Sequence, residues 1–198
     1  MKEFKVSGNN VNIFIVYKHD KEAKAVLSEL FYERAKPSLD DYRTIGSYED
    51  ACEVLGIDKL DEESMNACGV DKHIIALIKL ETVSRALWGA NFEPKPDIKG
   101  SKTYWLPIFS LYKESTIAEF FTDPQRFSAL HATIGSNENM VFGDLGASEM
   151  SSADILPAGF RLCQECRKKG EYFSMQFIEL WSEYLAYNFT TGEKYAIG

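Results

Sequence analysis

Two cysteines, Cys163 and Cys166, are separated by the two residues typical of a reactive or metal-binding pair. Such a pair can bind zinc or exchange a disulfide, and a position at the start of a helix lowers the pKa of its thiols. A thioredoxin-like fold would need further strands and a proline-bearing loop, yet no proline and only 32 residues follow Cys166. Zinc would need Cys52 and Cys68, with fifteen residues between them, as the second pair. We therefore expect no metal and no cofactor, and a thiol- or zinc-dependent enzyme using Cys163 and Cys166 stays as an alternative.

Aromatic residues gather around a proline in residues 103–109, which have the composition of a strand. Pro107 has no backbone N–H and therefore favours an edge or a bulge of a sheet. Because side chains alternate along a strand, Trp105 and Phe109 should share one face and Tyr104 should lie on the other. Such rings can stack on a ligand or anchor a protein interface, although the same pattern is also typical of a core. The candidate ligand- or partner-binding residues are Tyr104, Trp105, Phe109, Tyr112 and Arg161.

The other residues of catalytic type form no recognisable catalytic arrangement. The three histidines, His19, His73 and His131, are scattered and match no metal-binding spacing. The sequence has no glycine-rich phosphate or dinucleotide motif and no serine elbow of a hydrolase. Acids such as Glu179 and Glu183 fit the solvated face of a helix better than an acid–base pair. We therefore predict no catalytic residues and a protein that is not an enzyme.

The composition argues against several classes of protein. Of 198 residues, 45% are apolar, which suffices for a core, and 30 acidic against 22 basic residues give a net charge of −8. This balance argues against general nucleic-acid binding and against binding to an anionic membrane. The longest apolar run, residues 13–17, is too short to cross a bilayer, and the N-terminus has no apolar export signal. We expect neither a membrane protein nor a secreted one.

Apolar periodicity and capping residues indicate the elements of the first half. Ser47 can cap a short helix that ends at Gly56, because serine accepts from the free N–H groups of a first turn and glycine suits a helix end. The predicted elements are a hairpin over 2–7 and 11–17 and helices over 20–36, 47–56, 61–68 and 72–88.

The second half is predicted to mix strands and helices. An Asp-Pro pair indicates a helix over 123–131, and the glycine- and serine-rich residues 143–159 indicate a loop. An apolar stripe along 164–188 predicts the longest helix in the chain, in which Gly170 permits close packing. The remaining predicted segments are strands over 103–109, 140–142 and 160–163 and a polar tail over 189–198.

Together these elements predict an α+β fold, in which a small antiparallel sheet packs against two main helices, 72–88 and 164–188. The N-terminal hairpin and helix are expected to form an extension. The predicted divisions are an extension over 1–45, a main domain over 46–188 with an enlarged insertion over 110–158, and a tail over 189–198.

Several segments of the main domain carry a resemblance to a known group of proteins. They are DACEVLGID at 50–58, the apolar helix at 73–87, YWLPIF at 104–109, GFRLC at 159–163 and QFIELW at 176–181. Across residues 47–188 the chain resembles uncharacterised proteins encoded by bacteriophages and mobile elements of gut Bacteroidetes. Phe160, where the group has a small residue, and a longer span before GFRLC depart from the pattern. The resemblance implies a phage or prophage gene, and hence a place in the bacterial host cytoplasm, or in the virion for a structural protein.

The missing catalytic motifs, the many aromatic residues and the long loops favour one function over two others. We predict a non-enzymatic, phage-encoded binding or assembly protein that acts through contacts with a protein partner or with itself as a homo-oligomer. A first alternative is a small-molecule sponge or inhibitor of host defence, with a nucleotide-like ligand held by aromatic rings and Arg161. The thiol- or zinc-dependent enzyme is the second alternative.

Overall fold

The computed structural model describes residues 36–117, 127–154 and 160–195. The chain divides into two units, Met1–Lys36 and Pro37–Gly198, and apart from Lys36 every residue described below belongs to the second. The predicted N-terminal hairpin and helix lie outside the described residues. In chain order the elements are η1 (Tyr42–Thr44), α2 (Tyr48–Leu55), α3 (Glu62–Ala67), α4 (Lys72–Trp88), β1 (Thr103–Lys113), η2 (Glu114–Thr116), β2 (Ala129–Ile134), β3 (Asn137–Ser151), α6 (Arg167–Gln176), α7 (Ile178–Leu185) and β4 (Thr190–Lys194).

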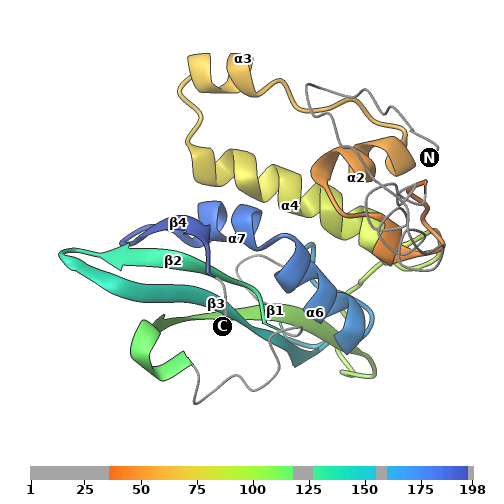
Figure 1. Cartoon of the computed structure of the whole chain (residues 1–198). Helices are drawn as coiled ribbons and strands as arrows, with labels where there is room; N and C mark the ends of the chain where they lie inside the picture. The colour runs from red at the N-terminus through yellow and green to blue at the C-terminus, as the bar shows by residue number, and fades with distance from the viewer. Residues whose placement is uncertain (1–35, 118–126, 155–159, 196–198) are drawn as a thin grey trace, which may run out of the picture. The chain divides into compact units, whose positions relative to one another are not determined.

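A four-stranded antiparallel sheet in the order β1-β3-β2-β4 lies on one side of the helices (Figure 1). β1 pairs with β3 over its whole length, from Thr103 opposite Ser151 to Lys113 opposite Met140. β2 and β3 form a hairpin, and β4 pairs with the free side of β2. The predicted α+β class with an antiparallel sheet is confirmed.

Pro107 lies on the outer edge of the sheet, where its missing N–H leaves no ladder bond unmade. Trp105 exchanges two backbone hydrogen bonds, of 2.9 and 2.8 Å, with Gln164 on the side away from β3. Backbone groups two residues further along a strand point in the same direction, so the nitrogen of Pro107 also faces away from β3. The expected edge position is confirmed.

Helices cover one face of the sheet in successive layers (Figure 1). α6 packs on β1 and β3, α7 packs against α4, and α2 packs on α4 in turn. Gly170 brings α6 close to the sheet, because a Cβ at this position would lie 2.7 Å from the Cβ of Ala147 in β3. The close packing predicted for Gly170 is therefore confirmed.

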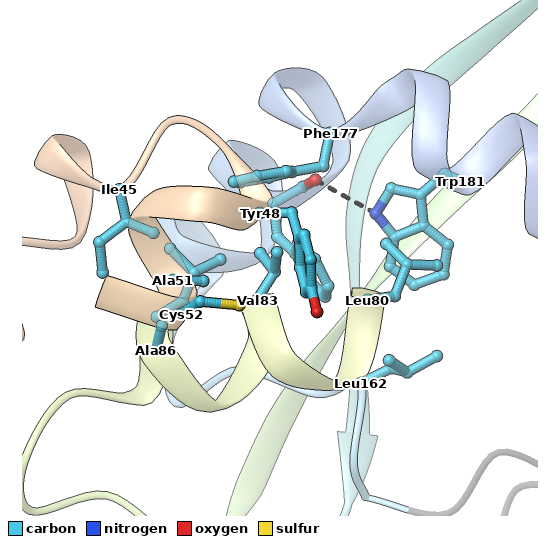
Figure 2. Close-up of a cluster of buried hydrophobic side chains, with 12 residues drawn as sticks. Ile45, Tyr48, Ala51, Cys52, Leu80, Val83, Ala86, Leu162, Phe177 and Trp181 are labelled. Carbon is cyan, nitrogen blue, oxygen red and sulfur yellow. Dashed lines mark hydrogen bonds between the residues drawn. The ribbon is translucent and has the colours of Figure 1, made fainter. Parts of the chain in front are cut away.

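The main core lies between α2, α4 and the α6–α7 pair (Figure 2). Leu80 and Val83 of α4 are fully buried in it, together with Cys52 of α2 and Trp181 of α7. Burial of one such aliphatic side chain stabilises a fold by about 1.5–3 kcal/mol. The Trp181 Nε1 also donates to the carbonyl oxygen of Phe173 at 3.1 Å, which gives a partner to one carbonyl in the last turn of α6.

The local signals at both ends of α2 are confirmed. Ser47 Oγ accepts a 3.1 Å hydrogen bond from a backbone N–H in the first turn of α2, and the helix ends at Gly56, whose φ is 62°. Asp61 caps α3 in the same way, by accepting from the N–H of Ser64 at 3.0 Å. The predicted helix over 72–88 is α4.

The predicted continuous helix over 164–188 is wrong, because the structure has two helices here. α6 ends at Gln176 and α7 begins at Ile178, and the backbone of Phe177, with φ −112° and ψ 27°, leaves the helical region. The apolar stripe continues through the break, so periodicity alone did not reveal it. The predicted strand over 160–163 is also wrong: these residues form a turn closed by Cys163 N donating to Phe160 O. Pairing with β1 begins at Gln164.

Segments predicted to lie outside strands belong to the sheet. Residues 129–131, predicted as the end of a helix, begin β2, because pairing with β3 outweighs the local helix signal. Residues 143–151, predicted as loop, are the second half of β3, which also includes the predicted strand over 140–142. Thr190–Lys194, within the predicted polar tail, form β4. Much of the predicted insertion over 110–158 thus lies in the sheet.

The glycines of β3 explain why this strand resembled a loop in the sequence. A Cβ at Gly143 would lie 2.4 Å from the ring of Phe127, so the strand needs glycine where that ring packs on it. Gly146 has φ of 102°, beside a bulge that leaves Leu145 without a partner between the pairs at Gly146 and Asp144. Both glycines serve the packing and bending of a strand.

Candidate interaction surface

The predicted aromatic residues lie on both faces of β1, as their alternation requires. Phe109 stacks on Phe142 with ring centroids 5.2 Å apart and lies equally close to Trp181 of α7. Trp105 lies beside Gly170 of α6, on the same side. Tyr104 packs with a different set of side chains, which includes Phe92 and Phe160. The predicted separation of Trp105 and Phe109 from Tyr104 is confirmed.

The structure does not bring the candidate residues into one site. Tyr104 is 2% exposed, and Tyr112 packs on Phe127 in a further cluster. Arg161 is exposed in the turn after Phe160 and forms a 3.1 Å ion pair with Glu81 of α4. Tyr104, Phe109 and Tyr112 therefore pack in different clusters, and Arg161 lies on the surface with a carboxylate partner.

The cysteine pair is divided between core and surface. Cys163 is fully buried, donates its thiol to the carbonyl oxygen of Phe160 at 3.0 Å, and its pKa is raised by burial to about 12. Cys166 is half-buried and immediately precedes α6. Among the described residues no group of three metal-ligating side chains converges. The surroundings of Cys163 oppose formation of the thiolate that redox or metal chemistry requires.

A cavity of about 480 Å³ opens at the end of β1. The described residues that line it are Lys113, Glu114, Ser115 and Asn139, and none of them is one of the predicted aromatic residues. No helix in the described part of the chain has the length and apolar character needed to cross a lipid bilayer.

Among the described residues, the most exposed large apolar side chain is an isoleucine in the segment between α4 and β1. Ile98 is 97% exposed, at the second position of a turn in which Gly100 N donates to Asp97 O at 2.9 Å. Turn positions of this kind are normally polar, since an apolar side chain there gains nothing from the fold. We call residues 95–102 the lysine turn, because Lys95, Lys99 and Lys102 lie in it and are exposed.

Hydrogen bonds hold the lysine turn at both ends. Asp97 N donates to Ser152 O at 2.8 Å, and Ser152 N donates to Lys102 O at 2.9 Å, which joins the turn to the end of β3. Tyr104 Oη accepts from Lys95 N at 3.1 Å and donates to Lys95 O at 3.0 Å. The buried ring of Tyr104 thus fixes the start of the turn, so one predicted site residue supports this surface from the core.

The carboxylate of Asp97 organises the inside of the turn. It accepts hydrogen bonds from Lys99 N and from the backbone and hydroxyl of Ser101. The hydrogen bond from the Ser101 hydroxyl has the largest effect in lowering the pKa of Asp97, and the bond from the Lys99 backbone N–H lowers it further. The acid therefore stays ionised and holds the loop, while the side chain of Ile98 projects from a fixed backbone.

Sequence reasoning assigned no element and no site residue to 91–100 and therefore missed this surface. The signal that could have found it is the apolar residue inside an Asp-Ile-Lys-Gly turn, next to lysines in an acidic chain. Tyr187, in the link between α7 and β4, is 91% exposed. Among the described residues, it is the other large apolar side chain whose exposed fraction exceeds one half.

Comparison with protein-family models, with curated proteins and with solved structures finds no match to this chain.

Proposed function

We propose that this protein is a non-enzymatic binding protein, encoded by a phage or mobile element, that acts through protein–protein contacts made by the lysine turn. The observation that carries the proposal is the 97% exposure of Ile98 on a turn that is hydrogen-bonded at both ends. An apolar side chain on a fixed backbone can enter a partner's pocket without a large loss of conformational entropy. Buried anchors of this type carry most of the binding free energy in many interfaces.

The lysines around Ile98 give the contact its selectivity. Lys99 and Lys102 are exposed on the same turn, while Lys95 forms a 2.9 Å pair with the exposed Glu93. Charges at the rim of an interface add little affinity but accelerate and orient association, and their effect is weakened by salt. The proposed partner surface is an apolar pocket bordered by carboxylates.

The proposal is tested by crosslinking from the tip of the turn in the cells in which the gene is expressed. A photoreactive amino acid in place of Ile98 should form a specific crosslink, and the same substitution at Leu145, which is 47% exposed on β3, serves as the matched control. The crosslinked protein is then purified, and its binding to the wild-type chain and to the Ile98→Asp variant is measured. We expect binding to weaken about tenfold or more. Equal crosslinking from both positions, or equal affinity of both chains, would contradict the proposal.

A further inference from the structure

We propose that the partner of the lysine turn is a second copy of this chain, which presents the acidic surface of α2 and α3. This inference rests on the proposed function and names the occupant of the same site. It concerns a head-to-tail contact, in which the turn of one copy docks on residues 49–63 of the next.

The acidic surface has the charge that the lysine turn requires. Residues 49–63 contain seven acidic residues and one lysine, a far higher acidic density than in the rest of the chain. Three of these carboxylates act within the fold: Asp50 accepts from Gly46 N, Asp61 caps α3, and Glu62 pairs with Lys79 at 2.7 Å. The other four acids of this surface, Glu49, Glu53, Asp58 and Glu63, are exposed, and so are Asp61 and Glu62.

The same surface offers apolar contacts for Ile98. Ile57, directly after the Gly56 that ends α2, is 39% exposed, and Leu60 is half-buried three residues further on. Both lie between the exposed acids Glu53 and Glu63 in the sequence. On the acidic surface, apolar side chains lie between acids, and on the lysine turn, Ile98 lies between lysines. The two surfaces therefore have the same order of apolar and charged groups, with charges of opposite sign.

The two surfaces belong to different parts of the described fold. The lysine turn is bonded to the ends of β1 and β3, whereas α2 and α3 lie on the side of α4 away from the sheet (Figure 1). A contact between two unlike surfaces leaves one unused copy of each at the ends of the pair. Such an interface continues into a ring or an open chain of copies instead of closing as a two-fold dimer.

The size of the contact sets the conditions under which assembly is seen. One anchor and a few exposed charges form a small interface, typical of weak and transient association. The charges are screened within about 10 Å at 0.1 M salt. We therefore expect association at high protein concentration and low salt, and dissociation into single chains as salt is added.

Two blocked variants of the full chain test the contact by sedimentation velocity. The turn-blocked variant is Ile98→Asp, and the acid-blocked variant combines Glu53→Lys with Asp58→Lys. All three side chains are exposed, so both variants should fold, and circular dichroism checks this. Leu145→Asp makes the same change of charge at another exposed apolar residue and is the matched control.

The wild type and the Leu145→Asp control should gain mass with concentration at about 0.02 M salt and lose it at about 0.5 M salt. Each blocked variant alone should remain a single chain. An equimolar mixture of the two should form dimers that grow no further, because one intact turn meets one intact acidic surface and the other ends are blocked.

Three results would overturn the inference. They are a wild type that stays a single chain at every concentration in low salt, a blocked variant that assembles like the wild type, and a mixture that forms no dimer. If a different acidic protein is crosslinked from Ile98 and bound in an Ile98-dependent way while the wild type stays a single chain, the proposed function holds and self-assembly is refuted. If neither binding nor assembly depends on Ile98, both proposals fail.

Discussion

Two neighbouring regions join α6 and α7 to the sheet, one through packing of aromatic rings and the other through hydrogen bonds to a buried carboxyl. Under α7, the ring of Phe109 packs on those of Phe142 and Trp181, with centroids 5.2 Å apart in both contacts. Under α6, the carboxyl of Asp144, the register partner of Phe109, is 1% exposed and is held by hydrogen bonds. The stability contributed by the first region depends on how well the rings fill space, and that contributed by the second depends on whether Asp144 is protonated.

The polar region joins three parts of the fold through Asp144. Its Oδ1 accepts from Ser128 N at 2.8 Å, and its Oδ2 lies 2.9 Å from Ser174 Oγ of α6. Burial raises the pKa of Asp144, and the charge of Glu171 raises it further, while the hydrogen bonds from Ser128 and Ser174 lower it. The stability that apolar packing contributes falls when a methylene is removed, whereas the stability that this polar contact contributes changes with pH.

Removal of a ring from the apolar region should produce the largest effect. Trp181 is 4% exposed and lies 4.9 Å from Phe173 and 5.2 Å from Phe109, between ring centroids. We expect Trp181→Ala to lower the free energy of unfolding by about 3–5 kcal/mol, measured by urea denaturation, with little change between pH 4 and 7. Tyr187→Ala, at a 91% exposed aromatic residue, should stay within about 0.5 kcal/mol of the wild type. Similar losses for both variants would show that the ring cluster carries no special share of the stability.

The contrast between the two regions also explains what could be predicted from the sequence. Helix ends depend on neighbours within a few residues, so Ser47 and Gly56 indicated the ends of α2 correctly. The apolar stripe identified the buried face of the C-terminal helices, since burial follows helical periodicity. It did not reveal the break at Phe177, where the indole of Trp181 binds the end of α6.

Features created by distant partners escaped prediction. β4 contains two threonines, a glycine, a glutamate and a lysine, and it becomes a strand because β2 offers it an edge. Asp144 was one acid in a glycine-rich stretch, and its burial follows from the bulge at Leu145 and from the approach of Ser174. The exposure of Ile98 likewise depends on the hydrogen bonds that fix the turn to Ser152.

Substitution of Asp144 should separate its hydrogen bonds from its charge. Asp144→Ala leaves the partly buried N–H of Ser128 without its acceptor, and we expect a loss of about 1–3 kcal/mol in the free energy of unfolding at pH 7. Asp144→Asn keeps an oxygen for Ser128, and its amide can donate to Ser174 Oγ, so this variant should lose much less. Both are measured by urea denaturation across a series of pH values.

The pH dependence of the asparagine variant gives the sign of the effect. Because the pKa of Asp144 is raised in the folded chain, its contribution to stability is complete below the pKa of the unfolded chain and is lost as the pH rises through the folded value. Asparagine does not titrate, so the stability of Asp144→Asn relative to the wild type should increase from pH 4 to pH 7. A decrease over this range would mean that the fold favours the ionised carboxylate.

For Ser174→Ala, which removes one donor from the carboxylate, we expect an effect that depends on whether Asp144 is protonated. Ser174 Oγ lies 2.9 Å from both Asp144 Oδ2 and the carbonyl oxygen of Glu171, and its single proton can serve one of them at a time. With Asp144 ionised, the hydroxyl donates to the carboxylate. With Asp144 protonated, the acid can donate to Oγ while the hydroxyl donates to Glu171, so both protonation states have satisfied partners.

The loss in Ser174→Ala should therefore be about 0.5–1.5 kcal/mol at low pH and larger at pH 7, where the lost bond was to a charge. The pKa of Asp144, followed by NMR of its carboxyl carbon, should rise further in this variant. In the Asp144→Asn background the same substitution should cost less and show no pH dependence. Ser182→Ala is the matched control, since the buried hydroxyl of Ser182 donates to the Glu179 carbonyl at 2.8 Å and not to a carboxylate. An equal, pH-independent loss in both backgrounds would show that Ser174 and Asp144 are not coupled, and the two regions under the helices would then differ in composition but not in their response to pH.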